Sequence, residues 1–192
     1  MIGLATSKAV NCGALGAFLL TTLLAAPAVA KAPVRGVCAF IAYNKDRDPH
    51  GLNVRAGPGT ASKIIGVISP LPDDEHINDV PFQLKVLQAR DGWFFVEYET
   101  LIPNTTRKQS HQGWVSGAML DFTVQRAIGQ AKPDQQSPIV WTPDRRSQPD
   151  TVPFSRVLDC EGPWALLELR SGAKTRQAWF TQLCDNPLTT CN

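Results

Sequence analysis

A short alternating stretch that runs into a forced turn constrains the fold of this chain more than any other feature. Residues 52–59 read LNVRAGPG. Apolar and polar side chains alternate over the first half, which is typical of a strand with one buried face. Gly-Pro-Gly then forces a turn, because glycine accepts positive φ and proline fixes φ. Further along, Gly113, Trp114 and Val115 close the same segment. Together these features predict a small all-β barrel and favour a binding module over an enzyme.

Residues 1–30 are typical of a removable export signal. Lys8 supplies a positive charge, residues 14–26 form a small and apolar run, and Ala28-Val29-Ala30 is a small-x-small cleavage site. We predict a signal peptide over residues 1–30, cleavage after Ala30, and a periplasmic or secreted protein. An uncleaved anchor is the alternative. The run is shorter than the roughly 20 residues that span a bilayer, so we expect no stable membrane anchor.

The charge pattern argues against a nucleic-acid partner. The chain has 19 Lys and Arg residues against 17 Asp and Glu residues. The basic residues are scattered, with doublets only at residues 107–108 and 145–146. A surface that follows phosphates needs many basic side chains on one face, so we expect no nucleic-acid binding.

Cysteine usage agrees with export. Cys12 lies in the predicted signal peptide, and an even number of cysteines remains: Cys38, Cys160, Cys184 and Cys191. In an oxidising compartment these predict two disulfides, whose pairing the sequence leaves open. A Cys38–Cys191 bridge would join the two lobes and make the pair rigid. A metal site is not expected, because there is no CxxC spacing and the histidines lie in the first half of the chain.

An internal repeat organises the rest of the chain. Residues 86–97, VLQARDGWFFVE, align without gaps on residues 157–168, VLDCEGPWALLE. Both copies predict a strand, a polar turn, a tryptophan and a second strand. A further tryptophan follows each copy, Trp114 in the first and Trp179 in the second, with a longer loop in the first copy. We therefore predict two related lobes, at residues 36–122 and 139–192, joined by a linker at residues 123–138.

These motifs resemble the bacterial SH3 (SH3b) domain family, whose sequences carry an LNVRxGPG stretch, a GW pair and a closing GWV. Residues 52–59, Gly92-Trp93 and Gly113-Trp114-Val115 carry the resemblance, which covers residues 37–120. The second lobe resembles the family only in its later half and is a degenerate copy. The resemblance implies an all-β fold of two small, SH3-like, partly open β-barrels in tandem.

Candidate ligand-binding residues follow from side-chain chemistry and from the resemblance. Tyrosine and arginine are favoured at binding surfaces. In SH3-like barrels ligands tend to lie between long loops, here residues 43–52 and 72–81. The candidates are Tyr43, Arg55, Trp93, Tyr98 and Trp114. For the tryptophans, packing in the core and exposure in a ligand groove are both open alternatives.

One short segment is similar to a catalytic motif. Residues 159–162, DCEG, superficially resemble the DCxG nucleophile motif of NlpC/P60 cell-wall peptidases. A cysteine nucleophile needs a base to form thiolate, and in that family the histidine follows the cysteine, whereas no histidine follows His111 here. We therefore expect no catalytic residues, no metal and no cofactor.

The working hypothesis from the sequence is an exported, non-enzymatic binding module that recognises cell-wall (peptidoglycan) peptide. The alternative is an envelope protein–protein interaction adaptor, or a regulator of a cell-wall hydrolase. A thiol-dependent peptidase is a third, less favoured hypothesis.

Overall fold

The computed structural model describes residues 36–70, 83–143, 152–171 and 174–184. The described residues all belong to one compact unit, residues 32–192. The predicted signal peptide lies outside the described residues, so everything below concerns this unit. Its described part consists of strands and one short 3₁₀ helix, η1 (Gly117–Met119), which agrees with the predicted all-β class.

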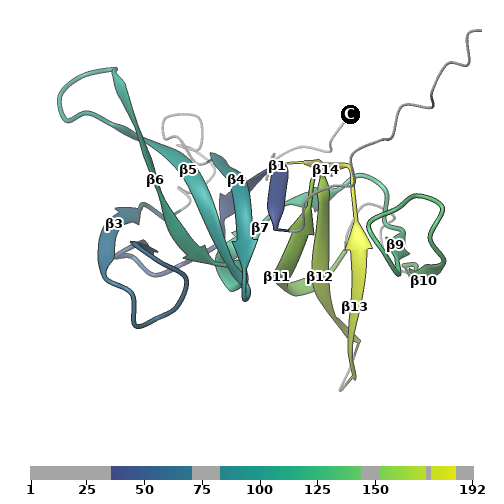
Figure 1. Ribbon diagram of the computed structural model, residues 1–192. Coiled ribbons are helices and arrows are strands. Elements are labelled where there is room, and N and C mark those ends of the chain that lie inside the picture. Colours follow the sequence, from purple (N-terminus) through teal and green to yellow (C-terminus); the bar gives the residue numbers. More distant parts are fainter. Residues whose placement is uncertain (1–35, 71–82, 144–151, 172–173, 185–192) are drawn as a thin grey trace, which may run out of the picture. The chain divides into compact units, whose positions relative to one another are not determined.

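The first half of the chain forms a seven-stranded antiparallel sheet in the order β3-β2-β6-β5-β4-β1-β7 (Figure 1). Its strands are β1 (Val37–Asn44), β2 (Leu52–Arg55), β3 (Ile64–Ile68), β4 (Gln83–Arg90), β5 (Trp93–Leu101), β6 (Lys108–Ser116) and β7 (Leu120–Asp121). The sheet curls so that alternate side chains face a core. In β1 every second residue is buried, as expected for a strand with one face on the core.

The LNVRAGPG stretch forms β2 and the turn that follows it, as predicted. Leu52 and Val54 are buried, and β2 pairs with β3 across the turn. Gly59 has a φ of 123°, a conformation that side chains other than glycine rarely adopt. This turn therefore returns the chain to form a hairpin at the edge of the first sheet.

The second half forms a five-stranded sheet in the order β10-β9-β13-β12-β11 and a separate two-stranded pair, β14-β8. The strands are β8 (Thr123–Val124), β9 (Gly129–Gln130), β10 (Ile139–Trp141), β11 (Phe154–Glu161), β12 (Trp164–Ser171), β13 (Lys174–Phe180) and β14 (Leu183–Cys184). Residues 123–138, which the sequence suggested as a linker, contain β8 and β9. Both strands pair with the second half of the chain, so this segment is part of that lobe's sheets.

The internal repeat is confirmed by strand register. In the first copy Gln88 pairs with Phe95, after a β-bulge that follows Val86. In the second copy Asp159 pairs with Leu166, after a β-bulge at the corresponding position. A third strand follows in both, β6 beside β5 and β13 beside β12. The two copies therefore share a three-stranded unit with the same register, including the same irregularity.

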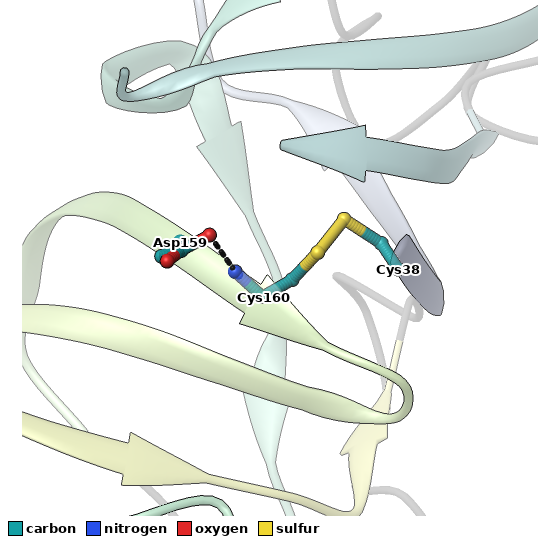
Figure 2. The surroundings of a disulfide bond; sticks show 3 residues. All are labelled: Cys38, Asp159 and Cys160. Atoms are coloured by element: carbon teal, nitrogen blue, oxygen red, sulfur yellow. Dashed lines mark hydrogen bonds between the residues drawn. A yellow bond between two sulfur atoms is a disulfide. The ribbon is translucent and has the colours of Figure 1, made fainter. Parts of the chain in front are cut away.

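The two sheets are joined by a disulfide between Cys38 of β1 and Cys160 of β11 (Figure 2). Beside it, the Ala39 amide donates to the carbonyl of Gly162 at 2.7 Å, and the Gly162 amide donates to the carbonyl of Val37 at 2.8 Å. The suggested Cys38–Cys191 bridge is wrong, because Cys38 is bonded to Cys160. Cys184 is also disulfide-bonded, and Cys191 lies outside the described residues.

A single hydrophobic core continues across the junction. Phe40 of β1 packs edge-on against Phe122 with ring centroids 5.5 Å apart, and Phe122 stacks on Phe154 of β11 at 5.0 Å. These rings link the first sheet to the second. The two halves of the chain therefore share a core cluster and a covalent bond.

Candidate binding site

Aromatic side chains gather on the side of the first sheet that faces away from its core. Phe95 of β5 pairs directly with Trp114 of β6, and their ring centroids are 5.5 Å apart with planes inclined at 53°. Trp93 lies two residues before Phe95 and so projects to the same side of the strand. All three side chains are half-buried. We call Trp93, Phe95 and Trp114 the aromatic face.

Strand alternation and a tight turn fix this arrangement. On β5, Phe94 and Val96 are fully buried, so their neighbours Trp93 and Phe95 must project outward. Asp91 and Gly92 link β4 to β5 with φ values of 53° and 75°. Positive φ at both positions is what a type I′ hairpin turn requires, and Asp-Gly is a favoured sequence for it. The turn therefore sets the register that places Trp93 on the outer side.

Charged and polar groups border the aromatic face. Arg90 pairs across the sheet with Trp93, and Lys85 pairs with Glu97 beyond the intervening pair of Gln88 and Phe95. Glu97 also accepts a hydrogen bond from the Gln112 amide at 2.9 Å. Cationic and anionic side chains thus lie next to an apolar aromatic surface, a combination suited to a ligand that carries both charges and apolar groups.

Arg55 lies on the same side of the sheet, opposite Trp114. Its guanidinium does not point freely outward, because Nη1 donates to the carbonyls of Thr60 and Ser62 at 2.8 Å each. These bonds close the turn after β2. Arg55 therefore positions the turn beside the aromatic face and offers little free donor capacity on that nitrogen to a ligand.

Tyr98 projects to the core side of the first sheet, away from the aromatic face. It is 6% exposed and its ring stacks on His111 at 5.3 Å. Nε2 of His111 is hydrogen-bonded to the Thr100 hydroxyl at 2.8 Å. Burial raises the pKa of Tyr98 above its usual value. Its role in this position is packing, with the hydroxyl close to the backbone at Gly66.

Tyr43 lies on β1, where it pairs with Asp121 of β7 rather than with the aromatic residues. Burial, the negative charge of Asp121 and a hydrogen bond to that carboxylate raise the pKa of Tyr43 to about 12. Burial also raises the pKa of Asp121 and lowers that of Lys45, although each charge partly offsets the shift of the other. Tyr43 therefore belongs to a half-buried polar cluster at a different place on the sheet.

Of the loops expected to flank a ligand, residues 72–81 lie outside the described residues. The loop after β1 is organised by its own side chains. Asn44, Asp46 and Asp48 each accept a hydrogen bond from the amide two residues further on, at 2.8 to 3.0 Å. Within the described ranges no group of acidic, histidine and cysteine side chains is arranged to hold a metal ion.

The structure thus brings together Trp93, Trp114 and the backbone-bound Arg55 and separates them from Tyr43 and Tyr98. Sequence reasoning missed Phe95. Its position two residues after Trp93, on a strand that alternates with buried Phe94, is the signal that identifies it. The sulfur of Cys160, considered as a nucleophile, is held in the disulfide with Cys38 and so offers no thiolate in this oxidised chain.

Comparisons with known proteins found no family, no curated protein and no solved structure that this chain matches. The SH3b resemblance therefore rests on the motifs alone. Among the described residues no helix has the length and apolar character needed to cross a membrane. The disulfide fits folding in an oxidising compartment.

Proposed function

We propose that this protein is an exported, non-enzymatic binding module that recognises cell-wall peptide through the aromatic face. The observation that carries the proposal is the group of half-exposed aromatic rings on the outer side of β5 and β6. A sheet with one face on a core usually places polar residues on the other face. Outward aromatic side chains at neighbouring positions are therefore more readily explained by recognition than by folding.

The chemistry of the surface suits a cell-wall peptide. Such peptides carry free ammonium and carboxylate groups on a short backbone with small side chains. Trp114 and Phe95 offer flat apolar area, while Arg90 and Glu97 lie near them with opposite charges. Tryptophan and arginine are enriched among the residues that dominate binding energy, and central aromatic anchors with a charged border are typical of binding surfaces.

Co-sedimentation with purified peptidoglycan sacculi tests this function. We compare the mature, oxidised chain with Phe95→Thr and with Leu101→Thr as a matched control. Leu101 lies at the far end of β5 and is 43% exposed. Introducing threonine there therefore leaves the aromatic face intact. Threonine is well tolerated in strands, which limits effects on folding.

We expect saturable binding that Phe95→Thr weakens about tenfold, the effect of losing about 1.4 kcal/mol, and that Leu101→Thr leaves unchanged. Equal binding by both variants would show that the aromatic face is not the binding surface. Sedimentation of the wild type no better than that of a non-binding protein would overturn the peptidoglycan proposal itself.

A role as an envelope protein adaptor is the second candidate, and the first sheet's edge strand favours it. Within the described residues β3 pairs only with β2. It exposes Ile64, Ile65 and Val67 by 45%, 52% and 45%. Apolar edge strands are templates for an added strand from a partner. Retention of a specific envelope protein that Ile65→Lys abolishes, without any binding to sacculi, would favour this role.

A further inference from the structure

The second sheet repeats five strands of the first in the same order. The orders β3-β2-β6-β5-β4 and β10-β9-β13-β12-β11 correspond strand for strand. In the hairpin at the edge of each sheet, Arg55 pairs with Ile64 and Gln130 pairs with Ile139. The side chain of Arg55 donates to the carbonyl five residues further on at 2.8 Å, and that of Gln130 does the same at 3.0 Å. The equivalence therefore extends to all five strands and to the turn within the edge hairpin.

The side chains on the core side differ between the two copies. Three fully buried residues of β5 and β6 have fully buried equivalents of another size on β12 and β13, namely Phe94 and Ala165, Val96 and Leu167, and Val115 and Phe180. Each copy thus fills its part of the core with its own set of side chains. The fold shared by the copies does not require particular residues to stay the same.

A set of outward-facing residues is nevertheless the same in both copies. Four pairs at equivalent positions are identical, namely Trp93 and Trp164, Glu97 and Glu168, Gln112 and Gln177, and Trp114 and Trp179. Outward positions can usually change freely, because substitutions there cost little stability. Identity on the outer side beside divergence in the core therefore indicates that the outer side is kept for binding.

Outward residues around this set differ even in charge. Arg90, which pairs with the first tryptophan of its copy, corresponds to Glu161 in the second copy. At the other end of the same two strands, Glu99 corresponds to Arg170. The outer side as a whole has therefore diverged, and the residues that stay the same are confined to the two tryptophans and the glutamate and glutamine beside them.

Contacts within the protein do not explain why the glutamate stays the same. Glu97 accepts a hydrogen bond from the Gln112 amide at 2.9 Å. Glu168 instead accepts a hydrogen bond from the Ser155 hydroxyl and lies 3.4 Å from Nε of Arg156. A role in stabilising the sheet would have kept the partner as well as the residue. The shared feature is the side chain that each sheet presents on its outer side.

The second sheet also offers space beside this set. A cavity of about 220 Å³ lies at Trp164, and its other lining residues come from residues 126–139 and from Thr181 and Gln182 after β13. Trp179 is half-buried two residues before Thr181 and so projects to the same side of the chain. This volume is below the 300–1,000 Å³ of drug-sized sites and suits a small side chain of a peptide.

We propose that the outer side of the second sheet is a second binding site for the same class of ligand, a cell-wall peptide. This inference rests on the proposed function of the aromatic face and extends it. Trp164 and Trp179 supply aromatic surface, and Leu166, which pairs with Trp179, supplies the apolar contact between them. Glu168 and Gln177 supply the polar contacts. One chain therefore binds two peptides of the wall.

An NMR titration of the oxidised mature chain tests the second site. Peptidoglycan fragments released from sacculi by a muramidase are the soluble probe, and the indole N–H signals of the five tryptophans are the readout. Trp93 and Trp114, the first pair, report on the aromatic face, whereas Trp164 and Trp179, the second pair, report on the second site. Trp141 packs against the core and is the internal reference.

Two variants alter the second site, and each has a matched control. Leu166→Thr is compared with Arg170→Thr, which lies on the same side of β12 at its far, exposed end. Gln177→Ala is compared with Thr175→Ala on the same side of β13. Both of these β13 positions are exposed, so neither alanine should disturb folding.

We expect the fragments to shift the signals of both pairs and to leave that of Trp141 in place. Leu166→Thr should weaken binding at the second pair about tenfold and Gln177→Ala about fivefold, while binding at the first pair stays the same. The two controls should bind like the wild type at both pairs. Binding by Leu166→Thr and Gln177→Ala that equals that of their controls would overturn the second site.

The two pairs of signals let the two proposals fail separately. Shifts confined to the first pair would overturn the second site and leave the proposed function of the aromatic face standing. Shifts confined to the second pair would support the second site and refute the aromatic face. No shift at either pair would overturn both proposals.

Discussion

The sulfur atoms of Cys38 and Cys160 are bonded to each other although 122 residues separate the two cysteines in the sequence. Both side chains are buried, at 4% and 1% exposure, at the point where β1 meets β11. The bond closes a loop that contains nearly the whole of the first lobe. It therefore joins the two sheets at the position where backbone hydrogen bonds also cross between them.

Removing this bridge should cost a large part of the stability. A closed loop of this length constrains the unfolded chain by about 4 to 5 kcal/mol in the loop-entropy estimate. We expect Cys38→Ala/Cys160→Ala to lower the free energy of unfolding by about that amount, a large share of the 5–15 kcal/mol typical of a domain. Urea denaturation followed by tryptophan fluorescence measures it. A decrease in the free energy of unfolding of less than about 1 kcal/mol would contradict this prediction.

Arg55 should act on stability and leave binding unchanged. Its guanidinium spans two carbonyls, at Thr60 and Ser62, with one nitrogen. Lysine lacks the planar fork and carries a more strongly hydrated charge, so Arg55→Lys should lower the free energy of unfolding by about 1–2 kcal/mol. Arg90→Lys, at an exposed position on β4, serves as the control and should change stability little. Weaker binding to sacculi with unchanged stability would instead make Arg55 a ligand contact.

Gly117 should be indispensable for packing the second sheet on the first. A Cβ atom at this position would overlap the carbonyl oxygen of Val157 on β11 and lie 2.6 Å from the ring of Phe94. A backbone carbonyl cannot move aside easily. We therefore expect Gly117→Ala to lower the free energy of unfolding by about 2 kcal/mol or more, which a lower melting temperature would show. Gly57→Ala is the control, since its Cβ would meet only the Ser62 side chain. Similar melting temperatures for the two variants would show that the contact between η1 and β11 is loose.

Tyr43 should make the protein sensitive to alkaline pH. Its pKa is raised from 10.0 to about 12, so the folded state favours the neutral phenol. This contribution is fully present below pH 10.0 and is lost as pH rises toward 12. We expect about 1 kcal/mol from this half-buried group once solvent screening is allowed for.

The measurement is the urea denaturation midpoint of wild type and Tyr43→Phe across this range. As pH rises, the denaturation midpoint of the wild type should fall more steeply than that of Tyr43→Phe. The absorbance of tyrosinate at Tyr43 should appear at a higher pH than that of free tyrosine. The chain has only two tyrosines, and Tyr98 remains in the variant to report its own titration. Parallel stability curves for the two proteins would refute the role of Tyr43.

Much of the secondary structure could be predicted because it depends on local patterns. The alternation in residues 52–55 and the positive φ of Gly59 specify a strand and its turn without help from distant residues. The repeat predicted a shared unit, and the matching bulges after Val86 and Val157 confirm it. The linker was misjudged because β9 is only two residues long and gains its structure by pairing with β13, which the local sequence does not record.

The candidate sites show the limit of residue-type reasoning. Tyr43 and Tyr98 have the chemistry of ligand contacts, yet Tyr98 is buried on the core side and Tyr43 faces Asp121. Phe95 was not among the residues that the sequence suggested for binding, but its ring lies against Trp114. The cavity at Trp164 involves residues from the β8–β9 connection and from β12, which are distant in the chain. Side-chain type indicates what a residue can do, and only its neighbours decide what it does.

The sequence by itself determined the all-β class, the strand–turn units and the repeat, because hydrophobic alternation, glycine and proline act over a few residues. Tertiary structure alone decided that Cys38 bonds Cys160, that the two halves share a core, and which aromatic rings face outward. These depend on contacts between residues far apart in the chain. Such contacts form only when the whole chain buries its apolar surface together, so no local pattern contains them.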